Sequence, residues 1–203
     1  MLVTVRNFNL DHSGVSFDGR ILNFSKDLIF LGVKLDKSLN FRSHVQMITG
    51  KIAKSTGMFY KVRENLNRQA RINFYYGLIF PYISYCILVW GGTCQTHLNP
   101  LIRQQKRIIR LIAGAERIAH TSPLFFEYKI LKVVDVYRYF VCIYMFMARK
   151  NGLYMSDHTH STRSQFFAPL SFQRLSCTQR SLSFIGPKIW NELPISLKKI
   201  EFF

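Results

Sequence analysis

A run of residues without a formal charge, from Ile72 to Trp90, sets the first limit on how this chain can fold. The run is close to the ~20 apolar residues that a helix needs to span a bilayer. It also contains Asn73, Gly77 and Pro81, and its four tyrosines are spread along it rather than gathered at the ends, where membrane interfaces place them. These features favour a buried helix or helix pair over a transmembrane span. Pro81 is expected to kink or break that helix.

Helical periodicity begins before this run. Between Asn40 and Val62, apolar residues recur at steps of three or four, or their multiples, which indicates one buried face of a helix. Lys51 and Lys54 fall on another face of the same helix. A second helix is expected to start near Asn67 and to run into the uncharged segment.

Turn signals delimit the helices that follow. The glycines of Gly91-Gly92-Thr93 predict a break. Asn99-Pro100 then predicts an N-cap and the first residue of a helix that ends at Gly114. A further helical region is expected from Thr121-Ser122-Pro123 to Met147.

The N-terminal residues are predicted to form strands. Asp18-Gly19 lies between Val15–Phe17 and Ile21–Phe24, and an Asp-Gly pair between such segments is a hairpin signal. The run from Leu28 to Leu35 is predicted to be a further strand. Gly32 inside it predicts a bulge or a close approach of another part of the backbone.

Positive charge is the main functional signal. The 203 residues contain 28 Lys and Arg but only 11 Asp and Glu, a formal net charge of +17. Because 48% of the residues are hydrophobic and 15% aromatic, the chain can bury a core, which argues against a disordered basic tail. A folded protein with this imbalance usually meets a polyanion, either nucleic acid or an anionic membrane surface.

The basic residues are concentrated where acids are absent. The stretch from Asn65 to Ala115 has no acid, and its basic residues are Arg68, Arg71, Arg103, Lys106, Arg107 and Arg110. Arg103, Arg107 and Arg110 are spaced by four and three, so they form one stripe on a helix. A solvated helix face normally mixes both signs of charge. The stripe therefore favours contact with phosphate groups, with release of counterions.

Catalytic signatures are absent from the sequence. The acids are spread thinly, no two are adjacent, and there is no Asp-Asp pair. Phosphate-binding and nucleophile-elbow glycine motifs are also missing. His158 and His160, with Cys177, could form half of a metal site, but zinc sites normally show paired ligands, which favours structural or exposed histidines. No catalytic residue and no metal ligand is predicted.

The cysteines and the N-terminus indicate a compartment. No Cys-x-x-Cys pair occurs among Cys86, Cys94, Cys142 and Cys177. We interpret them as reduced thiols, since a chain of this size does not need disulfides to build a core. The N-terminus lacks the pattern of a signal peptide. The expected location is intracellular, in the nucleus or the cytoplasm, and the protein is not expected to be secreted.

Five ordered strings of sequence carry a resemblance that extends over nearly the whole chain from about Ile21. They are Phe30-Leu31-Gly32-Val33-Lys34-Leu35-Asp36 followed by Leu39-Asn40-Phe41-Arg42-Ser43-His44-Val45; Ile79-Phe80-Pro81-Tyr82-Ile83-Ser84-Tyr85 with Trp90-Gly91; Gln105-Lys106-Arg107-Ile108-Ile109-Arg110-Leu111-Ile112-Ala113-Gly114; Arg180-Ser181-Leu182-Ser183-Phe184; and Gly186-Pro187-Lys188-Ile189-Trp190-Asn191-Glu192-Leu193-Pro194. Together they resemble the C-terminal part of non-LTR retrotransposon reverse transcriptases of the jockey and CR1 type.

The resemblance implies a set of nucleic-acid-binding residues. Phe30, Leu31 and Gly32 match the primer-grip hairpin of that family, and the helices after it match the thumb, which holds the template–primer duplex. Lys51 and Lys54 lie on the first thumb helix. A basic helix further on carries Arg103, Lys106, Arg107 and Arg110. The family's catalytic aspartates, including its Tyr/Phe-x-Asp-Asp box, have no counterpart in this sequence.

The predicted fold class is mostly α with an N-terminal β-hairpin region (α+β), in which a helical thumb-like bundle precedes a loop-rich extension. The expected divisions are a palm-edge and primer-grip region at 1–38, the thumb and following helices at 39–152, and the extension at 153–203. Residues 156–183 are expected to be a surface loop or a partly ordered extension. Order is expected to return at Phe184–Leu193, with Trp190 as an anchor.

The expected function is that of a truncated RNA-directed DNA polymerase of a mobile element, which keeps template–primer-binding parts but lacks the catalytic carboxylates. Its expected partner is an RNA–DNA duplex, bound without sequence preference, and no small-molecule substrate is expected. No cofactor is expected in this chain, although the full-length family would use Mg²⁺. Two alternatives stay open: a free-standing basic nucleic-acid-binding module, and a membrane-associated protein that uses the Ile72–Trp90 run.

Overall fold

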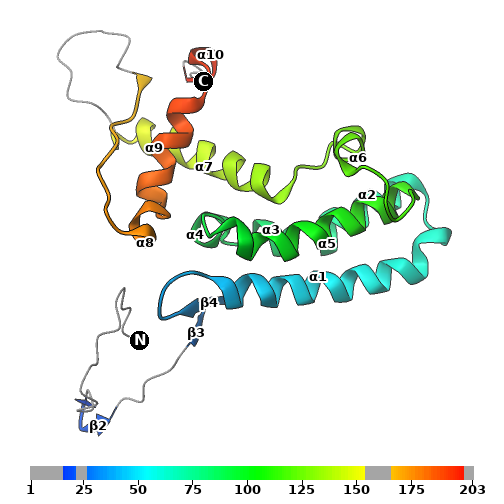
Figure 1. The fold of residues 1–203 in the computed structure, drawn as a ribbon, viewed down its shortest axis with the longest axis horizontal. Helices are drawn as coiled ribbons and strands as arrows, with labels where there is room; N and C mark the ends of the chain where they lie inside the picture. Colours follow the sequence, from blue (N-terminus) through cyan, green and yellow to red (C-terminus); the bar gives the residue numbers. More distant parts are fainter. Residues whose placement is uncertain (1–15, 22–26, 154–165, 199–203) are drawn as a thin grey trace.

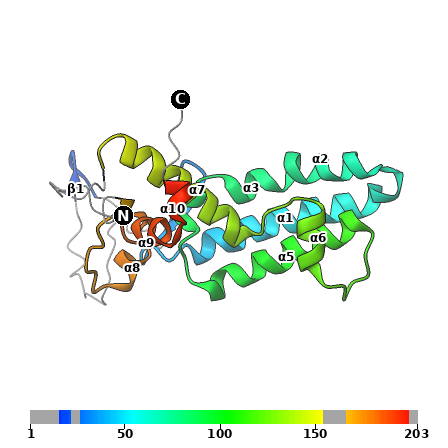
Figure 2. The same ribbon diagram turned by 90° about the horizontal axis from the view of Figure 1, so that it is seen from above.

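The structure is a computed structural model that describes residues 16–21, 27–153 and 166–198. These residues are mostly helical, with two short β-hairpins preceding the first helix, so the predicted fold class is confirmed. Helices α1 (Arg42–Val62) and α5 (Gln95–Ala113) lie side by side along the length of the molecule, and the chain returns between them through α2, α3 and α4 (Figure 1). Viewed from above, α2 and α5 lie on opposite sides of α1 (Figure 2).

The first hairpin confirms its Asp-Gly signal. Strands β1 (Ser16–Phe17) and β2 (Arg20–Ile21) pair antiparallel. Asp18 and Gly19 between them have φ values of 50° and 73°, the left-handed conformation that two-residue hairpin turns require.

The prediction of a single strand at Leu28–Leu35 is wrong, because this segment belongs to a second hairpin. Strands β3 (Asp27–Phe30) and β4 (Val33–Asp36) pair antiparallel around a turn at Leu31 and Gly32, with φ values of 45° and 77°. Because the turn residue Leu31 is apolar, the hydrophobic pattern continues through the turn and conceals it. The predicted bulge or close backbone approach is not found at Gly32: a Cβ there would lie 3.5 Å from Cε1 of the Tyr85 side chain, an ordinary van der Waals contact.

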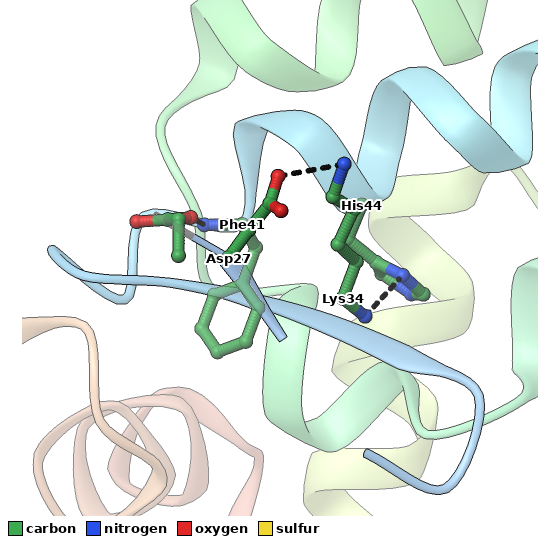
Figure 3. A network of polar contacts seen from close by, with 5 residues as sticks. Asp27, Lys34, Phe41 and His44 are labelled. Carbon is green, nitrogen blue, oxygen red and sulfur yellow. Dashed lines mark hydrogen bonds and ion pairs between the residues drawn. The ribbon is translucent and has the colours of Figure 1, made fainter. Parts of the chain in front are cut away.

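The carboxylate of Asp36 organises the junction between β4 and α1. It accepts hydrogen bonds from the backbone amides of Ser38 (3.0 Å), Asn40 (3.1 Å) and Phe41 (2.8 Å). Phe41, the residue before α1, has a φ of 56°, so this bend is held by side-chain bonding rather than by a glycine. Figure 3 shows Phe41 beside the contacts that join the hairpin to α1.

We expect Asp36→Ala to lower the free energy of unfolding by about 2 kcal/mol, because three amides lose a charged acceptor at the start of a helix. Chemical denaturation followed by circular dichroism would measure this. Glu116→Ala is the matched control, since Glu116 is an exposed acid without a side-chain hydrogen bond among the described residues, and it should change stability by less than about 0.5 kcal/mol. Equal effects of the two changes would contradict the role of Asp36.

The uncharged run, for which one helix or a helix pair broken at Pro81 is predicted, forms three short helices, and Pro81 lies in the first turn of the second of them. They are α2 (Arg68–Leu78), α3 (Phe80–Ser84) and α4 (Ile87–Trp90). Asn67 caps α2 by accepting a hydrogen bond from the amide of Ala70 at 2.8 Å. Within the described residues, no helix combines the length and the hydropathy that a membrane span requires.

Helix α5 starts earlier than the sequence suggested. The predicted N-cap at Asn99 is wrong: the helix begins at Gln95, and Pro100 lies inside it. Leu98 in the added turn is buried, and the hydroxyl of Thr93 just before the helix donates to the carbonyl of Asn40. Tertiary packing therefore adds a turn that local capping signals do not reveal. The predicted end at Gly114 is confirmed, with a φ of 64°.

The helical region predicted from Thr121 to Met147 is two helices, α6 (Thr121–Glu127) and α7 (Val133–Lys150). The break between them includes Lys129, whose φ is 52°. The side chain of the buried Gln105 holds this break in place through the backbone of Leu131 and Val133.

The segment 153–203, expected to be rich in loops, contains α8 (Ser176–Gln179), α9 (Leu182–Glu192) and α10 (Ile195–Lys198) among its described residues. Helix α9 packs on α7 (Figure 1) and contributes to the core. Trp190 is buried, and its Nε1 donates to the carbonyl of Phe166 at 3.0 Å, which confirms it as an anchor. His158 and His160 lie outside the described residues, so the half metal site stays untested.

Candidate nucleic-acid interface

Helix α5 separates a buried apolar face from an exposed basic face. Its buried residues are Leu98, Leu101, Gln105, Ile108, Ile109 and Ile112. On the other side Arg103, Lys106 and Arg107 are exposed and Arg110 is half-buried. Since a helix turns by about 100° per residue, Arg103, Arg107 and Arg110 lie within about 60° of one another. We call Arg103, Lys106, Arg107 and Arg110 the α5 stripe.

The cations of the α5 stripe have no acidic partner among the described residues. The ion pairs found there are Lys34–Asp27 at 2.7 Å, Arg63–Glu64 at 3.4 Å, Arg68–Glu127 at 3.0 Å and Arg138–Glu192 at 3.0 Å. None of them reaches α5. The positive charge of the stripe is therefore open to an anion from solution.

Besides Arg68, which pairs with Glu127, two of the basic residues in the acid-free stretch have structural contacts. Arg110 donates from Nε to the carbonyl of Ala119 at 2.8 Å, which ties the loop after α5 to the helix. Arg71 donates from Nε to the carbonyl of Leu66 at 2.9 Å and from Nη1 to that of Ile112 at 3.3 Å. Replacing either residue would disturb the fold as well as the charge.

A groove lies where α1 and α5 end. It has a volume of about 520 Å³ and is lined by Tyr60, Arg107, Arg110, Leu111, Ala115 and Arg117. Tyr60 is 55% exposed, and the guanidinium carbon of Arg63 lies 3.9 Å from the centre of its ring. Three arginines therefore line this groove together with one tyrosine.

The lysines predicted on the first thumb helix lie elsewhere. Lys51 and Lys54 are exposed on α1, and Nζ of Lys51 lies 5.6 Å from the centre of the Tyr82 ring in α3. Lys51 and Tyr60 are nine positions apart, which places them on opposite sides of α1, about 180° apart. The structure does not bring these lysines to the groove.

The predicted grip residues occupy a third location. The tip of the second hairpin exposes Phe30 (60%) and Leu31 (73%), and Oη of Tyr85 donates to the carbonyl of Leu31 at 2.8 Å. This hairpin lies at the start of α1, at the opposite end of the bundle from α6 (Figure 1). Of the predicted site residues, only Arg107 and Arg110 line the groove.

His44 joins the second hairpin to α1 and is structural. The backbone amide of Lys34 donates to its Nδ1 at 3.2 Å, and Nζ of Lys34 pairs with Asp27 at 2.7 Å (Figure 3). The ring meets Trp90 edge-on with centroids 5.7 Å apart. Burial, together with the charge of Lys51, lowers the pKa of His44 to about 4, so the ring is neutral at neutral pH. Within the described residues, no group of three His, Cys, Asp or Glu is placed to hold a metal ion.

Comparison with known proteins supports the resemblance of the sequence. The RNA-directed DNA polymerase from mobile element jockey of Drosophila funebris is 30% identical over 140 residues, which cover 67% of this chain and 15% of that protein. The jockey polymerase of Drosophila melanogaster is 28% identical over 137 residues, which cover 66% of this chain and 15% of that protein. The chain is related to the reverse transcriptases of non-LTR mobile elements.

A third relative of the chain is the probable RNA-directed DNA polymerase from transposon X-element of Drosophila melanogaster. It is 28% identical over 109 residues, which cover 52% of the chain and 12% of that protein. The chain thus spans about 15% of the length of the jockey polymerases it matches. No protein-family model and no solved structure matches it.

The sequence patterns of this chain did not predict Tyr60, Arg63 and Arg117 as residues of the site. Arg117 follows Glu116, just outside the acid-free stretch, so charge counting passed over it. Tyr60 lies on α1, outside its buried apolar face, and nothing in the local sequence sets it apart. Neither the count of charges nor the helical spacing reveals the groove, because the residues that line it come from two helices and a loop.

Proposed function

We propose that this chain is a nucleic-acid-binding part of a mobile-element reverse transcriptase, and that the α5 stripe contacts the phosphate backbone of an RNA–DNA template–primer duplex. The observation that carries the proposal is the row of α5 cations without an acidic partner among the described residues. The kinship with RNA-directed DNA polymerases supports nucleic acid as the polyanion.

We propose further that this chain alone binds without polymerising. Two-metal phosphoryl transfer requires a cluster of carboxylates that binds Mg²⁺ and activates the primer hydroxyl. The sequence has no Asp-Asp pair, and the acids among the described residues form no such cluster. The residues that the structure describes therefore do not fit this metal, and no catalytic step is assigned to them.

Binding of this kind has a definite salt dependence. Each phosphate that a cation neutralises releases a counterion, so the logarithm of the affinity falls linearly with the logarithm of the salt concentration. The slope depends on the number of phosphates contacted, not on base sequence. A steep slope with little sequence preference is the expected behaviour.

We expect the triple change Arg103→Ala, Lys106→Ala and Arg107→Ala to weaken binding to an RNA–DNA duplex by at least tenfold at 100 mM salt. The salt slope should become shallower by about two to three, because each phosphate that is no longer neutralised lowers it by close to one. Fluorescence anisotropy with a labelled hybrid of random sequence measures both quantities. All three residues are exposed, so the fold should be retained.

The matched control removes the same charge from exposed cations elsewhere: Lys150→Ala, Arg174→Ala and Lys188→Ala. This triple variant should keep most of the affinity and the slope. If both triple variants weaken binding equally, the protein responds to net charge alone, and the α5 stripe is not the contact surface.

A further inference from the structure

The groove at the end of the bundle has a composition that the α5 stripe lacks. Helices α1 and α5 run in the same direction (Figure 1), so their C-terminal ends meet there. Tyr60 comes from the last turns of α1, Arg107 and Arg110 come from α5, and Arg117 comes from the loop after α5. One tyrosine and three arginines thus line one space of about 520 Å³.

The guanidinium groups dominate the electrostatics of this space. A helix C-terminus would normally repel an anion, because its last carbonyls are free. Here the carbonyls of Arg110 and Leu111 accept from the amides of Ala115 (2.9 Å) and Gly114 (3.3 Å). The carbonyl of Ile112 accepts from Arg71. With these carbonyls occupied, the positive charges are left to attract an anion.

The arginines that line the groove differ in the hydrogen bonds and ion pairs that hold their side chains. Arg110 is held by its hydrogen bond to Ala119, and that bond fixes the loop that carries Arg117. Arg107 and Arg117 make no ion pair within the described part of the chain, and both are exposed. They can therefore turn toward a phosphate at little cost.

Tyr60 supplies a flat apolar surface next to these charges. The guanidinium carbon of Arg63 lies over one face of the ring, 3.9 Å from its centroid, so a base would stack on the other face, and more than half of the surface of Tyr60 is open to solvent. Leu111 and Ala115 add apolar surface to the same groove. A flat apolar surface beside a phosphate-binding group matches the two halves of a nucleotide, its base and its phosphate.

The size of the groove excludes a double helix. Its volume lies within the ~300–1,000 Å³ of small-ligand sites, so the stacked base pairs of a duplex cannot enter it. One unpaired nucleotide can. The exposed α5 stripe, by contrast, has no such limit and suits a continuous backbone.

We propose that the groove holds one unpaired nucleotide of a single-stranded nucleic acid, with its phosphate between Arg107 and Arg117 and its base stacked on Tyr60. This inference rests on the proposed function and adds a second, single-strand-specific contact to it. A strand that leaves the duplex on the α5 stripe would be captured at the end of the same helix.

The test compares two labelled single strands of twelve positions: oligodeoxyadenylate, and the same sugar–phosphate chain with abasic sites throughout. Tyr60→Ala should weaken binding of the first about tenfold, within the range found for one stacked base. It should leave binding of the abasic strand within twofold, since that strand has no base to stack on the ring. Tyr60→Trp should restore binding of oligodeoxyadenylate.

Arg117→Ala provides the complementary result. It should weaken both strands by a similar factor of about three to ten, because both carry phosphates. Arg174→Ala, which removes an exposed cation elsewhere, is its control and should change neither by more than twofold. Thermal melting confirms that each variant is folded.

The outcomes separate the two proposals. If Tyr60→Ala weakens both strands equally, or neither, the stacking site is refuted. An unchanged affinity of Tyr60→Ala for the RNA–DNA hybrid is expected, and a tenfold loss there would refute the assignment to single strands. If the α5 triple variant keeps its hybrid affinity while Tyr60→Ala loses oligodeoxyadenylate, the duplex proposal fails and the groove stands.

Discussion

Gln105→Leu is expected to lower the free energy of unfolding by about 4 kcal/mol, although it places an apolar residue in the core. Gln105 is 1% exposed. Its Nε2 donates to Oη of Tyr75 and to the carbonyl of Leu131, both at 2.8 Å, and its Oε1 accepts from the amide of Val133 at 3.0 Å. Leucine would leave these three groups without their partner, and each buried polar group left unpaired costs about 1–3 kcal/mol.

The neighbouring residue offers a matched control. Gln104 is half-buried, and its Oε1 is buried with no partner among the described residues. Gln104→Leu removes a buried amide oxygen that has no partner among the described residues, so it should be neutral or stabilising. Urea denaturation of the two variants gives the comparison. Equal stabilities would show that the amide of Gln105 does not hold the break between α6 and α7.

Trp90→Ala is expected to have an effect of similar size, about 3–5 kcal/mol, because it empties the largest fully buried side-chain position. The ring packs against His44, and its Nε1 donates to the carbonyl of Tyr85 at 2.9 Å. The change removes contacts that join α4 to α1 and to the residue that ends α3. Thermal unfolding should show a large fall in Tm, or failure to fold at 37 °C.

Val89→Ala is the control for this change, because the adjacent Val89 is 53% exposed. It should lower the free energy of unfolding by less than about 1 kcal/mol. An equally small effect of Trp90→Ala would mean that the uncharged run is not part of a packed core. The binding of nucleic acid by the folded fraction should be unaffected, since α4, which carries Trp90, lies at the opposite end of the bundle from the C-terminal ends of α1 and α5 (Figure 1).

Local signals were sufficient for the elements whose boundaries are set by local chemistry. The periodicity of α1, the Asn67 cap of α2 and the Gly114 end of α5 follow from spacing, capping and backbone freedom. The errors occur where distant groups decide. The start of α5 depends on packing of Leu98, and the break before α7 depends on the amide of Gln105.

The candidate site likewise has one part that the local sequence predicts and one part that depends on distant residues. The α5 stripe could be predicted, since charge and helical spacing are both properties of one segment. The groove could not, because Tyr60 and Arg117 meet only when α1 and α5 lie parallel and the loop after α5 is fixed by Arg110. Nothing in the spacing of these residues encodes that arrangement.

The parallel alignment of α1 and α5 has a consequence for how the chain reaches its fold. Neighbouring helices joined by a short loop are antiparallel and can pair early, but α5 meets α1 only after the chain has reversed through α2, α3 and α4. The entropy of closing this long loop must be overcome before the central contact stabilises anything. We therefore expect the α1–α5 contact to form late, in the rate-limiting step, with the short return helices already in place.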